Sequence, residues 1–104
     1  MDEQLSFRRA DHLDLPCLVV DGEIDMATAD EFRRQLDELI RSANSPALVD
    51  LRSVSFFDST GLHALLAARR SAEQRDVELR IRPSPKVVPA LDATRLAGLF
   101  SYES

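Results

Sequence analysis

Residues 47–51 read Ala-Leu-Val-Asp-Leu, and residues 56–66 read Phe-Phe-Asp-Ser-Thr-Gly-Leu-His-Ala-Leu-Leu. The first run is short and almost wholly apolar, which indicates a buried strand. In the second run, leucines at positions 62, 65 and 66 follow small polar residues at helical spacing, which predicts a helix that begins near Ser59. A buried strand followed by a helix is the repeating unit of an α/β fold.

The sequence before this unit predicts two strands and a helix. Apolar and polar residues alternate from Leu5 to Arg8, and after a turn-like segment the run 17–20 is apolar, so two strands joined by a short loop are expected. From Thr28 to Ala43 apolar residues recur at helical spacing, and Asn44-Ser45-Pro46 ends that helix.

The sequence after the central unit predicts a strand and further helices. Val77, Leu79 and Ile81 alternate with charged residues, which is typical of a half-buried strand. Ser84-Pro85 predicts an N-cap and the start of a third helix, which Pro89 is expected to shorten, to kink or to make restart near Ala90. Leu96, Leu99 and Phe100 around Gly98 predict a last packing element. We therefore expect a small mixed, largely parallel sheet of about four to five strands flanked by about four helices.

Composition bounds the class of protein. The chain has 104 residues, enough for a single domain, and its 18 acidic and 13 basic residues give a net charge of -5. That charge disfavours nucleic acid and anionic membranes as partners. Cys17 is the only cysteine, and no run of about 18 apolar residues occurs, so we expect a cytoplasmic protein.

The segment from Phe56 to Leu62 carries the chemistry of interest and has two interpretations. In one, Asp58 or Ser59 simply caps the free N–H groups of the helix that follows. In the other, Ser59 accepts a phosphate, because a helix N-terminus offers unpaired N–H donors and the positive end of the helix dipole. The added charge of about -1.5 to -2 beside Asp58 would repel a docked partner.

Enzyme, metal and cofactor functions find little support in the residues. Ser59 and His63 are four apart on one predicted helix, but adjacent Asp58 cannot easily orient the far side of His63, as a hydrolytic triad requires. Two histidines and no repeated carboxylate or cysteine cluster disfavour a metal site. The three glycines are too far apart for a phosphate-cradling loop, so no nucleotide or other cofactor is expected.

The motifs together resemble the STAS-domain anti-sigma factor antagonists of bacteria. Residues 57–62 resemble the signature loop of that family, and Asp21-Gly22-Glu23-Ile24-Asp25 with residues 28–32 resembles its Gly-Glu-Leu-Asp turn and first helix. Ser84-Pro85-Lys86-Val87 and residues 91–100 resemble its third and fourth helices. The resemblance extends from about Phe7 to Phe100 in the right order, which strengthens the individually weak motifs.

The resemblance implies a non-enzymatic protein that works by partner switching. Unphosphorylated, it would bind and sequester an anti-sigma factor serine kinase and release a sigma factor. That kinase would phosphorylate Ser59 and switch binding off, and a serine phosphatase would reverse the change. The implied contact residues are Asp25, Met26, Asp58, Ser59, Thr60, Gly61 and His63.

Some features leave alternatives open. Asp25 is equally well explained as a turn or cap residue before the first helix. His63 stands where the family often has glycine, and it either narrows the choice of partner or is a solvated or core-edge side chain. The whole chain could also be a STAS-fold scaffold or an accessory subunit, for example of a stress-signalling or lipid-transport complex. The oligomeric state does not follow from the sequence.

Overall fold

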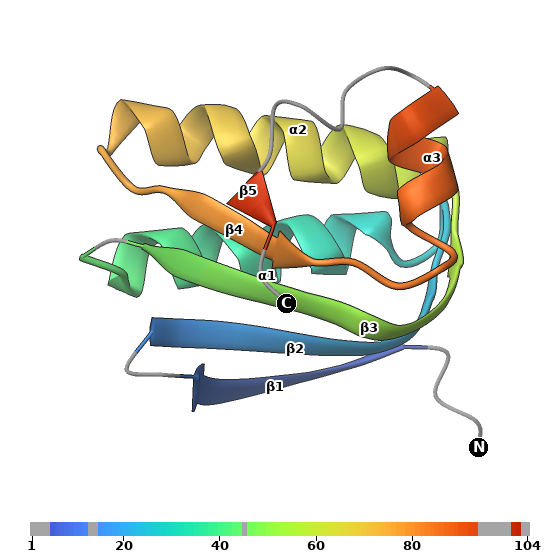
Figure 1. Cartoon of the computed structure of the whole chain (residues 1–104), viewed down its shortest axis with the longest axis horizontal. Helices are drawn as coiled ribbons and strands as arrows, with labels where there is room; N and C mark the ends of the chain where they lie inside the picture. Colours follow the sequence, from blue (N-terminus) through green and yellow to red (C-terminus); the bar gives the residue numbers. More distant parts are fainter. Residues whose placement is uncertain (1–4, 13–14, 45, 94–100, 103–104) are drawn as a thin grey trace.

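The computed structural model describes residues 5–12, 15–44, 46–93 and 101–102. Within these residues a five-stranded sheet packs against helices (Figure 1). In chain order the elements are β1 (Leu5–His12), β2 (Leu15–Ile24), α1 (Ala29–Ser42), β3 (Ala47–Phe57), α2 (Ser59–Gln74), β4 (Leu79–Arg82), α3 (Val88–Ala93) and β5 (Ser101–Tyr102).

The strands lie side by side in their order along the chain, from β1 to β5. β1 pairs antiparallel with β2, whereas β2–β3, β3–β4 and β4–β5 are parallel pairs. The expected mixed sheet of about four to five strands is therefore confirmed. The antiparallel pair runs the full length of β1, while β4 and β5 pair at only two positions, so the sheet is more evenly mixed than "largely parallel" suggests.

The helices α1 and α2 lie side by side on one face of the sheet (Figure 1). Alternate residues of β3, namely Ala47, Val49 and Leu51, point into the core beneath them. α1 contributes a buried stripe that includes Phe32 and Leu36, as the helical spacing of its apolar residues predicts. Burial of each such large side chain stabilises the fold by roughly 1.5–3 kcal/mol, so this face dominates the stability.

The third helix begins later than the sequence predicts. Ser84 is buried, and its hydroxyl donates to the carbonyl oxygen of Val54 in β3 at 3.2 Å and accepts from the Lys86 N–H at 3.2 Å. This anchor holds residues 85–87 as a turn, and α3 starts at Val88. The predicted helix start at Ser84-Pro85 is therefore wrong by about one turn, while the short helix expected around Pro89 is confirmed.

Three helices lie in the described residues, where about four were expected. The expected fourth helix, from Leu91 to Phe100, begins inside α3 at Leu91, and its portion from residue 94 lies outside the described residues.

Candidate functional site

Two loops meet at the edge where β2 and β3 end. Ile24 and Phe57 are register partners in these parallel strands, so the residues that follow them, Asp25 and Asp58, emerge at the same edge. The Asp58 N–H also donates to the carbonyl oxygen of Ile24 at 3.3 Å. The sheet itself therefore brings together the β2–α1 loop and the start of α2.

Asp58 caps the N-terminus of α2. Its Oδ1 accepts from the N–H groups of Thr60 at 2.9 Å and Gly61 at 3.4 Å and from the Thr60 hydroxyl. These hydrogen bonds lower the pKa of the Asp58 carboxyl below its usual range, and the bond from the Thr60 hydroxyl lowers it most. Asp58 is therefore ionised at neutral pH, and it holds the first turn in place.

Asp25 holds the turn that precedes α1. Its Oδ1 accepts from the N–H groups of Ala27 at 2.9 Å and Thr28 at 3.2 Å. In return, the Asp25 N–H donates to the Thr28 hydroxyl oxygen at 2.9 Å. The turn interpretation of Asp25 thus has direct structural support. The Asp25 residue is half-buried.

Ser59 is the first residue of α2, and its side chain is exposed. Among the described residues, no hydrogen bond engages its hydroxyl, and none joins it to His63, which is also exposed. The hydroxyl therefore faces solvent directly after the capping residue, at a helix N-terminus where an anion is favoured.

Gly61 is a buried residue in the first turn of α2. A Cβ on this residue would stand 2.8 Å from Ile24 Cγ2 and 2.8 Å from Phe57 Cε1, closer than carbon atoms pack. The glycine therefore lets α2 approach the ends of β2 and β3. Its contribution to the site is this close packing, because it has no side chain to offer a partner.

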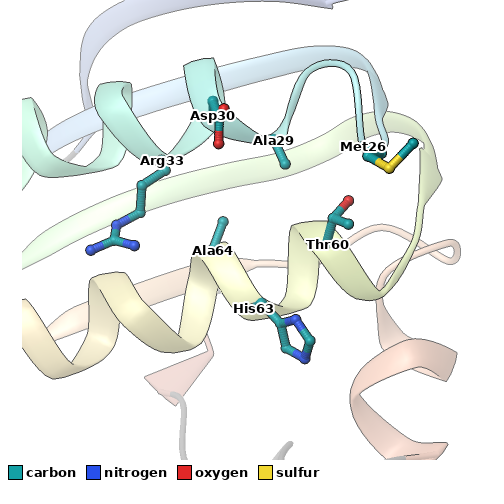
Figure 2. A pocket seen from close by; sticks show the side chains of 7 residues that line it. All are labelled: Met26, Ala29, Asp30, Arg33, Thr60, His63 and Ala64. Atoms are coloured by element: carbon teal, nitrogen blue, oxygen red, sulfur yellow. The ribbon is translucent and has the colours of Figure 1, made fainter.

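A hollow of about 400 Å³ separates the first turns of α1 and α2 (Figure 2). Its lining combines Met26, Thr60 and His63, which the sequence predicts as contact residues, with residues that sequence reasoning missed. The missed residues are Ala29, Asp30, Arg33 and Ala64. Helical spacing groups Ala29, Asp30 and Arg33 on one side of α1, but it does not show that this side of α1 lies beside α2. Met26 is 82% exposed at the rim.

The structure therefore groups most of the predicted residues. Asp25 and Met26 come from the β2–α1 loop, and Asp58, Ser59, Thr60 and His63 come from the start of α2. Ser59 does not line the hollow; along the chain it lies between the capping residue Asp58 and the lining residue Thr60. Among the described residues, the other exposed large apolar side chain is that of Phe56. It lies near the end of β3, two residues before Asp58.

A second charged cluster lies on the opposite face of the sheet. Asp50 alternates with the core residues Val49 and Leu51, and its carboxylate pairs with Arg52 at 2.9 Å and with Arg82, its register partner, at 3.7 Å. Burial raises the pKa of Asp50, but the hydrogen bonds from Arg52 outweigh that effect and leave it lowered. This cluster is structural and separate from the candidate site.

Among the described residues, no group of three or more His, Cys, Asp or Glu side chains is placed to hold a metal ion. No helix in that part of the chain is long and apolar enough to cross a membrane.

Comparison with known proteins places the fold in a family. The protein-family model of the STAS domain matches residues 6–103 of this chain. An anti-sigma-B factor antagonist of Listeria monocytogenes is 36% identical over 76 residues, which are 73% of this chain and 64% of that protein. An anti-sigma F factor antagonist of Paenibacillus polymyxa is 33% identical over 81 residues, 76% of this chain and 67% of that protein.

A solved structure agrees with these sequence matches. The crystal structure of an anti-sigma factor antagonist from Mycobacterium paratuberculosis superposes with a TM-score of 0.78 at 25% identity, covering 94% of this chain and 84% of that one. The chain nevertheless spans less than two thirds of the length of the Listeria relative.

Proposed function

The chain belongs to the STAS domain family, and we propose that it is an anti-sigma factor antagonist whose binding is switched off by phosphorylation of Ser59. In this proposal the unphosphorylated chain binds an anti-sigma factor that is also a serine kinase, and a sigma factor is released. The kinase phosphorylates Ser59, the complex separates, and a serine phosphatase restores the binding form. The chain is then a kinase substrate and a single binding domain, not an enzyme.

One observation carries the proposal: the Ser59 hydroxyl is exposed at the first position of α2, at an edge that also presents a hollow. A kinase active site must reach the acceptor oxygen, and the exposure of Ser59 allows this. The N-terminus of a helix favours a negative group by about 0.3–1 kcal/mol, so the fold tolerates the modification.

The surroundings explain why a phosphate would break a complex. The phosphate adds a charge of about -1.5 to -2 at pH 7 next to Asp58. Because the pKa of Asp58 is lowered, this carboxylate keeps its charge and cannot relieve the repulsion by taking up a proton. A partner that covers this edge would have to bury both negative groups, and burial of unpaired charge is costly.

The partner surface in this proposal comprises Asp25, Met26, Asp58, Ser59, Thr60 and His63. Met26 supports the assignment because an exposed, flexible thioether is suited to a protein contact. Gly61 serves the surface indirectly, by allowing α2 to lie close to β2 and β3.

The test is direct phosphorylation. Purified protein is incubated with ATP and with each candidate serine kinase from the same genome, and phosphate is located by mass spectrometry. We expect one kinase to label Ser59, to bind the unlabelled chain, and to leave Ser59→Ala unlabelled. Label on other residues alone, or no label from any kinase, would favour the alternative of a STAS-fold scaffold or accessory subunit.

A further inference from the structure

Ser59 and His63 share the outer face of α2. Residues four apart in a helix differ in direction by only about 40°, so the two exposed side chains point the same way. Thr60 and Ala64 have the same spacing, and like His63 they line the hollow between α1 and α2, which Ser59 does not. Figure 2 shows His63 turned away from α1, at the outer rim of that hollow. The imidazole is therefore one turn from the acceptor oxygen and on its side of the helix.

A phosphate on Ser59 would find part of the helix N-terminus already occupied. The N–H groups of Thr60 and Gly61 donate to Asp58 Oδ1, and the Leu62 N–H donates to the Asp58 carbonyl oxygen. The ionised Asp58 carboxylate also repels the phosphate. A side-chain donor is therefore needed to hold the new group in one orientation.

Two other basic side chains among the described residues are considered as partners for the phosphate, Arg33 and Lys86. Arg33 projects from α1 into the hollow and pairs with Asp37 at 3.7 Å, and its neighbour Asp30 is acidic. Lys86 is exposed in the turn before α3, a helix that contacts α2, and we therefore treat it as the rival donor. Of these three basic side chains, that of His63 shares a helix face with Ser59.

We propose that His63 holds the phosphate of phosphorylated Ser59 through a charge-assisted hydrogen bond along α2. The inference rests on the proposed function, since it concerns the phosphorylated state. It assigns His63 a positioning role in the unbound form: the imidazole fixes the phosphate on the outer face of α2, where a partner would have to displace it. The residue that departs from the family pattern thereby stabilises the off state.

The test uses the full chain with phosphoserine placed at position 59 during translation, so that no kinase is needed. The pH at the midpoint of the phosphate titration is followed by ³¹P NMR. A hydrogen-bond donor beside the phosphate favours the dianion, so His63→Gln should raise this midpoint by about 0.1–0.4 pH unit. His63→Arg should keep the low midpoint, and Lys86→Gln, the matched control, should leave it unchanged.

Two results would overturn the inference. One is an identical midpoint in the His63→Gln variant and the parent chain. The other is a midpoint that responds to Lys86→Gln instead. Because the phosphate is installed without a kinase, neither result bears on whether Ser59 is phosphorylated by a kinase. Conversely, failure of every kinase to label Ser59 would overturn the proposed switch but would leave the role of His63 beside an installed phosphate unaffected.

Discussion

Substitution of Gly61 by alanine tests whether α2 depends on close approach to the strand ends. The added Cβ would lie 2.8 Å from Ile24 Cγ2 and 2.8 Å from Phe57 Cε1. Carbon atoms in contact normally lie about 3.5–4.0 Å apart, so the methyl group overlaps each neighbour by about 1 Å. Ile24 is 0% and Phe57 is 9% exposed, so both neighbours are held by the core and cannot swing aside.

The net effect of Gly61→Ala is the difference between two terms. Overpacking of a filled core costs typically about 1–3 kcal/mol. Replacement of glycine by alanine in a helix interior gains up to about 1 kcal/mol, and less in the first turn. We therefore expect a loss of about 1–2 kcal/mol in the free energy of unfolding, and a Tm lower by about 4–8 °C for each kcal/mol.

Urea unfolding followed by circular dichroism measures this loss. Ser59→Ala is the matched control, because this exposed neighbour should change the free energy of unfolding by no more than about 0.5 kcal/mol. If Gly61→Ala proved as stable as the parent chain or more stable, helix propensity would outweigh the contact and the packing role of this glycine would be refuted.

Further predictions concern the caps, the charges and the switch. Asp58→Ala removes the α2 cap and should lower the free energy of unfolding by about 0.5–2 kcal/mol in urea titrations, and an unchanged midpoint would deny the cap. The pKa values of Asp50 and Asp58 are lowered in the folded chain, so their stabilisation is present above the unfolded pKa and is lost as pH falls through the folded one. At pH values below about 4, Tm should therefore decrease as the pH is lowered, and Asp50→Asn should weaken this pH dependence. The same dependence of Tm on pH in the parent chain and in Asp50→Asn would contradict the pairing of Asp50 with Arg52 and Arg82. Ser59→Asp should leave Tm nearly unchanged but weaken kinase binding about tenfold or more, and undiminished binding in a pull-down titration would count against the charge effect.

Much of the fold could be predicted from the sequence because its signals are local. The apolar runs and the helical spacing in α1 and α2 identify the alternation of strands and helices, and Asp58 marks the start of α2. The ends of the helices and strands were predicted less accurately. β3 continues to Phe57, six residues beyond the predicted apolar run, because its pairing with β2 extends to that residue.

The parts that could not be predicted depend on contacts between distant segments. Ser84 looked like a helix cap, but its hydroxyl binds Val54 across the fold, and α3 starts later for that reason. The α1 side of the hollow was missed because the periodicity of one helix does not give its rotation relative to another, so Asp30 and Arg33 could not be placed beside Thr60.

The central claim is that the charge state of Ser59 decides whether a complex forms. The most direct measurement is the Kd between the anti-sigma factor kinase that labels Ser59 and two forms of the chain, unmodified and carrying phosphoserine at position 59. We predict that the phosphorylated form binds at least about 100-fold more weakly, a difference of roughly 2.7 kcal/mol. Equal affinities for the two forms would contradict the account.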